Sequence, residues 1–267
     1  MKKFLPLSVI SLLAFFLFTT TTYSLSILGN QITIYDQKSD GSPWHGSNED
    51  QEVEPGMVGH QKWDLEGFFL DGNSLSMVGG FNFDDGESGI TSGDIFFDVD
   101  GTPQYGTDIS DGTTGNGNKV VDTTYGYDFA IKLDFGGNTF ALFKATAAAK
   151  TKSSFYKQNY SSNPWQIVDD GGWDEITTAA DSFEYEESKL DGDPLLNNMF
   201  LGDKHNIVQL TLPTELQGFN YVHFTEGCGN DNLMGAVPTP EAATTLLLAT
   251  GLAGLAGFGR KRLKKNP

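Results

Sequence analysis

The sequence lacks the residues that several classes of protein require. Cys228 is the single cysteine, so no internal disulfide bond can form. Both arginines lie in the last eight residues, and the chain between Leu25 and Glu241 has ten lysines against all 35 acidic residues, a net charge of −25. Such a body has no basic face for phosphate groups. The composition therefore argues against nucleic-acid binding and against adsorption of this region to anionic lipid.

Aromatic residues, by contrast, are abundant, with 20 Phe, 9 Tyr and 4 Trp. Acidic disordered chains are poor in aromatic residues, so this composition predicts a folded body. Short alternating runs separated by Gly, Asp and Asn predict strands and turns. We expect residues 25–235 to form one acidic all-β domain, a jelly-roll-like β-sandwich.

Two hairpins are predicted within this domain. Asp71-Gly72-Asn73 separates the apolar runs 68–70 and 75–78. Gly136-Gly137-Asn138 follows a strictly alternating run over residues 125–135 and precedes a returning strand at 140–143. Further strands are expected at 95–99, 207–212 and 221–224, and the apolar spacing from Trp173 to Phe183 predicts one helix.

The N-terminus has the layout of a secretory signal peptide. Lys2 and Lys3 precede an apolar run from Phe4 to Phe18, and a small polar stretch ends at Ser24. We predict residues 1–24 as the signal peptide, with cleavage after Ser24. An uncleaved anchor is the alternative, although the run is short for a bilayer span.

A second apolar run, residues 242–259, has no charge over 18 positions, about the lower limit for a transmembrane helix. A basic cluster follows it, made of Arg260, Lys261, Arg262, Lys264 and Lys265. Because positive residues stay on the cytoplasmic side, the run is expected to insert with its C-terminus inside and the acidic body outside.

Just before this run lies the segment Val237-Pro238-Thr239-Pro240-Glu241. Its two prolines favour an extended backbone, which suits the cleft of a processing enzyme. Val-Pro-x-Pro, a short Leu/Ala/Gly helix and a terminal Arg/Lys cluster together resemble a PEP-CTERM sorting signal over residues 236–265. The family pattern is Pro-Glu-Pro, whereas here Thr239 is central and Glu241 comes one place later.

This resemblance implies a bacterial protein exported through the inner membrane. A membrane-embedded exosortase-like enzyme would process it, and it would stay at the cell envelope or enter an exopolysaccharide matrix. A plain tail anchor is the alternative. Two inner segments, residues 77–101 and the stretch Thr225-Glu226-Gly227-Cys228-Gly229-Asn230-Asp231, also resemble parts of PEP-CTERM proteins, the second as a Thr-x-x-Cys-Gly-Asn-Asp motif, and the resemblance assigns chemistry to neither.

No catalytic site is predicted, because the sequence contains no nucleophile elbow, no phosphate loop and no closely spaced histidine pair. Calcium is the one cofactor to consider. Asp98 with Asp100, and Asp191 with Asp193, offer carboxylates spaced for oxygen coordination. They do not match an EF-hand, and ordinary acidic turns are the alternative.

Cys228 is predicted to be a free, partly buried thiol at a strand end, with intermolecular pairing as the alternative. His223, five residues earlier, would lie on the opposite face of a strand and so would not activate it. Four tryptophans are candidates for a sugar-binding platform: Trp44, Trp63, Trp165 and Trp173.

The sequence thus predicts a non-enzymatic surface or matrix protein with a structural or adhesive role. It contacts the membrane through its C-terminal helix before processing. A secreted carbohydrate-binding module, calcium-dependent or not, is one alternative. A polysaccharide hydrolase is the other, and it would require two carboxylates facing each other in an open cleft with one pKa raised by burial.

Overall fold

The computed structural model describes residues 29–34, 58–103, 119–154, 163–176, 181–187, 200, 205–229 and 231–237. Within these ranges the regular structure consists of fifteen β-strands and two short 3-10 helices, η1 (Val58–Trp63) and η2 (Thr214–Leu216). The domain is therefore all-β, as the alternating sequence pattern predicts.

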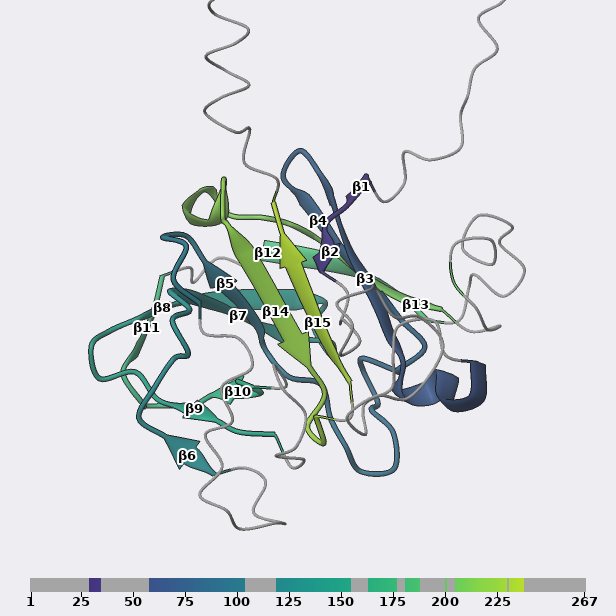
Figure 1. Ribbon diagram of the computed structural model, residues 1–267, viewed down its shortest axis with the longest axis horizontal. Coiled ribbons are helices and arrows are strands. Elements are labelled where there is room, and N and C mark those ends of the chain that lie inside the picture. Colours follow the sequence, from purple (N-terminus) through teal and green to yellow (C-terminus); the bar gives the residue numbers. More distant parts are fainter. Residues whose placement is uncertain are drawn as a thin grey trace, which may run out of the picture.

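Twelve strands form one antiparallel sheet (Figure 1). Its main path runs, in spatial order, through β1 (Asn30–Gln31), β3 (Leu65–Asp71), β4 (Ser74–Gly79), β13 (Asn206–Thr211), β12 (Asp181–Glu186), β8 (Thr139–Ala145), β7 (Phe129–Asp134), β5 (Ile95–Asp98), β14 (Tyr221–Thr225), β15 (Asn232–Ala236) and β2 (Thr33–Ile34). The twelfth strand, β11 (Trp173–Glu175), pairs with β8 off this path.

The two edges of this sheet are joined by one short segment of chain. β1 pairs with β3 and β2 pairs with β15, yet only Ile32 separates β1 from β2. The Ile32 N–H donates to Phe68 O at 2.9 Å, and the Ala236 N–H donates to Ile32 O at 2.8 Å. The order of strands is therefore circular, and residues 29–34 close it.

Strand alternation divides the apolar residues between an inner and an outer set. Phe68 and Met77 face the main core, where they join residues such as Phe97, Ile131 and Phe224 from the other half of the sheet. Phe69 and Val78, the next residues on these two strands, lie on the other face, in a smaller cluster with Phe200 and Ile207. One face of each strand therefore lines a single main core, and the two halves of the sheet form two layers around that core.

A separate three-stranded sheet covers part of the outer face of the main sheet, at the lower left of Figure 1. Its strands are β6 (Val120–Val121), β9 (Thr151–Lys152) and β10 (Gln166–Ile167). Ile167 packs with Phe96 and Ala130 in a second buried cluster that also contains Tyr125 and Tyr127. Strand β5 and the first three residues of β7, Phe129 to Ile131, are consequently buried on both faces.

Both predicted hairpins are confirmed. β3 and β4 pair across a turn in which Gly72 has a φ of +61°. β7 and β8 pair across a turn in which Asn138 has a φ of +52°. Glycine and asparagine adopt this left-handed conformation with little strain, which explains why these residues predict the turns. The expected strands near 95–99, 207–212 and 221–224 correspond to β5, β13 and β14.

The predicted helix over residues 173–183 is wrong. Trp173–Glu175 is strand β11, and Asp181–Glu186 is strand β12, which pairs with β13 on one side and β8 on the other. Apolar residues at a helical spacing do not fix a helix when neighbouring strand edges offer backbone partners. The alternating run also begins its strand later than predicted, because Tyr125 has a φ of +58° and β7 starts at Phe129.

Several predicted segments lie outside the described residues. They are the signal peptide 1–24, residues Pro238 to Glu241 of the processing segment, the apolar run 242–259 and the basic cluster 260–265. Among the residues that the structure describes, no helix has the length and apolar character needed to cross a membrane.

Candidate functional sites

Three aspartates gather at the end of β5. One carboxylate oxygen each from Asp98, Asp100 and Asp128 lies within 4.8 Å of the others. Asp98 is buried, Asp128 is half-buried and Asp100 is exposed. The sequence predicts the first two as a pair, and the fold adds Asp128 from the residue just before β7. We refer to these three residues as the acidic cluster.

Backbone N–H groups already serve each carboxylate of the acidic cluster. Asp98 accepts from Gly101 N at 2.8 Å and from Thr102 N at 3.0 Å, and Asp128 accepts from Val99 N at 2.9 Å. Burial raises the pKa of Asp98, these N–H groups oppose that rise, and the two neighbouring acids add to it. Carboxylates this close repel one another when all are ionised. The repulsion falls when one of them binds a proton or when the cluster binds a cation.

The other predicted calcium residues, Asp191 and Asp193, lie outside the described residues. Asp128 was missed because it stands inside the alternating aromatic run, between Tyr127 and Phe129. An acidic residue at the entry to a buried strand is a signal that could have identified it, but only strand pairing places it beside β5.

The described residues of the Thr-x-x-Cys-Gly-Asn-Asp stretch, 225–229 and 231, run from the last residue of β14 to the residue before β15. Thr225 Oγ1 donates to Asp231 O at 2.7 Å and closes this turn. Asp231 Oδ2 accepts from Leu65 N at 2.6 Å, which fastens the turn to the start of β3. The Gly93 N–H donates to Thr225 O, and the Gly227 N–H donates to Thr91 O. The stretch therefore connects the end of β14 to the start of β3 and to the residues just before β5, both distant from it in sequence.

Cys228 is 5% exposed, in the turn that follows β14 rather than on a strand. Its Sγ donates to Glu226 Oε1 at 3.4 Å. Glu226 is completely buried, which raises its pKa well above the ordinary value, and the contact with the thiol opposes this rise. Cys228 forms no disulfide, and its burial restricts access by a second thiol.

Further ionisable groups are buried within the fold. His205 Nδ1 lies 2.8 Å from both carboxylate oxygens of Glu66, and both side chains are fully buried. Burial raises the pKa of Glu66, an effect that His205 opposes. Glu66 occupies the position where the β3–β4 register shifts, so a bulge directs its side chain across β4 toward His205.

Asp94 and His223 are buried without a charged hydrogen-bond partner among the described contacts. Asp94 Oδ2 accepts from Ile167 N at 2.7 Å, and burial raises its pKa to about 7. His223 Nε2 lies 2.9 Å from Pro164 O, and burial lowers its pKa to about 4. Asp94, just before β5, thus contacts Ile167 of β10, and His223 of β14 contacts Pro164, just before β10. Both groups therefore join the main sheet to the region of the small sheet.

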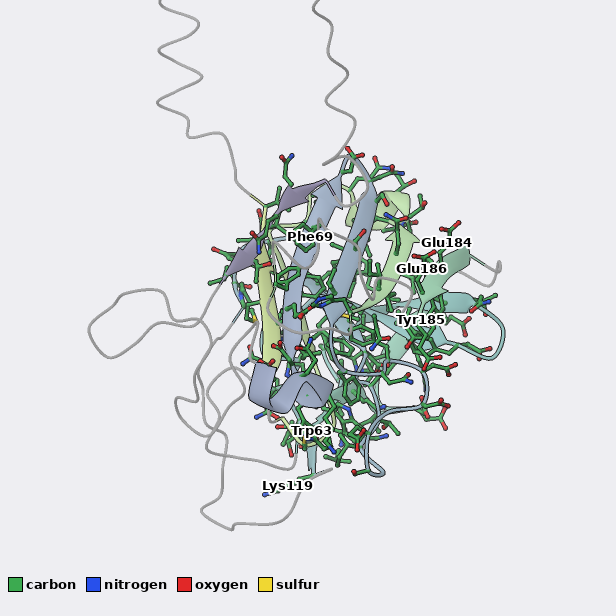
Figure 2. The ribbon with its side chains drawn as sticks, turned by 90° about the vertical axis from the view of Figure 1, so that its right-hand side faces the viewer. Trp63, Phe69, Lys119, Glu184, Tyr185 and Glu186 are labelled. Carbon is green, nitrogen blue, oxygen red and sulfur yellow. The ribbon has the colours of Figure 1, made fainter. Side chains whose placement is uncertain are left out.

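None of the three described tryptophans is solvent-exposed, as a sugar-binding platform would require: Trp165 is buried, and Trp63 and Trp173 are half-buried. Trp165 is 8% exposed, and Trp63 stacks on Phe81 with ring centroids 6.3 Å apart. Trp173 is half-buried, and its indole N–H donates to Lys150 O at 2.8 Å. Figure 2 shows Trp63, the last residue of η1, in the lower part of the domain, whereas Glu184 and Glu186 of β12 lie at the upper right. Trp44 lies outside the described residues.

Comparison of the chain with protein-family models, curated protein sequences and solved structures gives no match.

Proposed function

We propose that this chain is an exported bacterial protein of the cell surface or extracellular matrix, with a structural or adhesive role and no catalytic activity. One observation carries the proposal. The Ala236 N–H donates to Ile32 O at 2.8 Å, so the two ends of the described domain lie side by side (Figure 1). The predicted signal peptide and sorting segment continue from these neighbouring ends. Both apolar flanks can then enter one bilayer from the same end of the domain.

The distribution of charge supports the same arrangement. All 35 acidic residues lie between the two apolar flanks, and the basic residues at the two chain ends lie beyond them. Cations next to an apolar segment stay on the cytoplasmic side, which leaves the acidic body outside. Strong negative charge would keep that body soluble among anionic polysaccharides.

The start of the processing segment also favours this proposal. Val237 packs against the core, and its N–H donates to Asn220 O at 3.0 Å. Pro238 follows without an intervening linker. An exosortase-like enzyme would therefore meet its substrate directly beside the folded domain. The finer assignment of the fold, a jelly-roll-like β-sandwich, is part of the same proposal and is supported by the two layers around one core.

Intact-mass analysis of the protein from its own host tests the proposal. The mature form is expected to lack both residues 1–24 and the basic cluster 260–265. Replacing both Pro238 and Pro240 with alanine should block C-terminal processing, since the segment is then free to leave the extended form. As the matched variant, Thr239→Glu restores Pro-Glu-Pro and should be processed at least as fast.

The alternatives give different masses. A form that keeps Arg260 to Pro267 and stays in the membrane would indicate a plain tail anchor and refute sorting. An intact chain dissolved in the cytosol would refute export altogether.

A calcium-dependent binding module is a second candidate, and the acidic cluster is the observation that favours it. Carboxylates at this separation provide part of the oxygen shell that Ca²⁺ uses. Calcium at millimolar concentration should raise the melting temperature, and a chelator should reverse the shift. Asp128→Asn should abolish the response, whereas Asp174→Asn, an equal change of charge at an exposed position of β11, should preserve it. No shift in the unsubstituted protein would remove this candidate.

We do not propose a hydrolase. The buried acids Glu66, Asp94 and Glu226 are all below 4% exposed, whereas a glycosidase needs its carboxylates on either side of a bound sugar.

A further inference from the structure

Residues 29–34 lie between β3 and β15 and pair with both strands. We refer to the space that they occupy as the slot. A Cβ atom added at Gly235 would lie 2.7 Å from Val222 Cγ1 on β14 and 3.3 Å from Ile32 Cδ1, and one added at Gly67 would lie 3.0 Å from Thr33 Oγ1. Gly29 has a φ of +83°, and a Cβ there would lie 2.4 Å from Leu70 O. Glycine at these three positions lets the segment approach both edges closely.

Main-chain contacts hold this segment on both sides, and few of its side chains are buried. The Ile32 N–H and Ile32 O bind the two edges, and Thr33 Oγ1 accepts from Phe68 N at 3.0 Å. Ile32 is 5% exposed, whereas Asn30 and Gln31 are exposed and Ile34 is 41% exposed. One apolar anchor and a set of backbone hydrogen bonds therefore fix the strand, which is the way that an added β-strand binds.

The sequence around the segment differs from the rest of the domain. From Ser24 to Tyr35 there is no charged residue, although the chain between Leu25 and Glu241 has a net charge of −25. Edge strands are usually protected from pairing by charged residues. An uncharged, isoleucine-rich strand instead suits pairing with another edge.

If the segment leaves, the edges of β3 and β15 lose their backbone partners, and the main core loses the side chain of Ile32. The sequence that fits both edges is the segment itself, so a second copy is the matching occupant. Between Ile34 and Val58 the chain has 23 residues, enough to span about 80 Å when extended. That length lets the segment reach a neighbouring molecule while its own domain stays folded.

We propose that residues 29–34 are an exchangeable strand, and that the slot between β3 and β15 accepts the same segment from a second copy of this chain. Each copy then donates one strand and receives one, which forms a dimer if the exchange is reciprocal and a longer assembly if it is not. This inference concerns assembly and holds whether or not the chain is sorted at its C-terminus.

Disulfide trapping between two different full-length chains, purified in detergent, tests the proposal. Asn30 and Leu70 are directly opposed, and opposed residues of antiparallel strands lie roughly 4.5–5.5 Å apart, within disulfide range. One chain carries Asn30→Cys and the other carries Leu70→Cys, both in a Cys228→Ser background. After mixing and mild oxidation, a covalent heterodimer should form about tenfold or more above the yield with the control chain Ile176→Cys. Ile176, 37% exposed, follows strand β11.

Two further measurements keep this test decisive. A single chain with both Asn30→Cys and Leu70→Cys should form the bond within one copy when dilute, which shows that the slot is intact in this background. A synthetic peptide of residues 25–35 should suppress the heterodimer, whereas the same peptide with Ile32→Asp should not. An intrachain bond in the double variant without heterodimer above the control in the mixture would overturn the proposal. So would equal suppression by both peptides.

Discussion

Acidic residues occupy two contrasting regions of this domain. In the acidic cluster, Asp98, Asp100 and Asp128 range from buried to exposed, and each accepts N–H groups from nearby loop residues. In the turn between β14 and β15, Glu226 and Asp231 are almost completely buried, and Asp231 binds the distant strand β3. Acidic residues therefore extend to the surface in one region, through Asp100 and Asp128, and join separate buried segments in the other.

Solvent explains the difference. Water reaches the carboxylates of Asp100 and Asp128 in the acidic cluster, so the loss of a protein contact at these two residues is largely replaced by water. In the turn, water does not reach Asp231, and every N–H group that it serves would be left without a partner. Changes in the turn should therefore affect stability much more than changes in the cluster.

The largest effect is expected for Asp231→Ala. This change removes the acceptor for Leu65 N and Asn232 N, and each buried donor left unpaired costs about 1–3 kcal/mol. Urea unfolding should show a loss of about 2–4 kcal/mol in the free energy of unfolding. Asp231→Asn keeps one acceptor oxygen and should lose clearly less. Equal, small losses in both variants would contradict the anchoring role of this turn.

An intermediate effect, dependent on pH, is expected for Asp94→Asn. The pKa of Asp94 is about 7 in the folded protein and close to 3.8 when exposed. The protonated form is thus the one that suits the fold, and its contribution is complete below pH 4 and is lost as the pH rises to 7. Because protonation of Asp94 is linked to folding, the free energy of unfolding should fall steadily over this pH range.

Asparagine cannot ionise, and its carbonyl oxygen can still accept from Ile167 N. Relative to the unsubstituted protein, Asp94→Asn should therefore gain stability between pH 4 and 7 and show a constant difference above pH 7. Thermal unfolding across this pH range measures the gain. Asp174→Asn is the control, because Asp174 is exposed on β11 and should leave the slope unchanged. If the variant and the unsubstituted protein change in stability with pH in the same way, ionisation of Asp94 does not destabilise the fold and this prediction is wrong.

The smallest effect is expected for Asp100→Ala. Asp100 is exposed, and its Oδ1 accepts from Thr102 N at 3.1 Å within one turn. Without calcium, its removal should change the free energy of unfolding by about 0.5 kcal/mol or less. A larger loss that appears only with calcium would show that the cluster binds the ion, and so would sharpen the contrast with the buried turn.

The prediction of a single helix illustrates the limit of sequence patterns. Trp173, Ile176, Ala180 and Phe183 have helical spacing, yet β11 and β12 both pair with β8 in the structure. Local spacing reports which residues are apolar, whereas the availability of a neighbouring strand edge decides how their backbone is paired. The same limit applies to Asp128, which no local pattern connects to Asp98.

The sequence by itself determined the class of fold and its turns. Alternating aromatics predict strands because side chains of a strand point to opposite faces, and Gly72 and Asn138 predict turns because their backbones tolerate a positive φ. Only the tertiary structure decided which edges meet, which acids are buried and that residues 29–34 close the sheet. These features depend on pairings between residues far apart in the chain, such as Leu65 with Asp231. Such pairings arise from long-range packing, which no local period encodes.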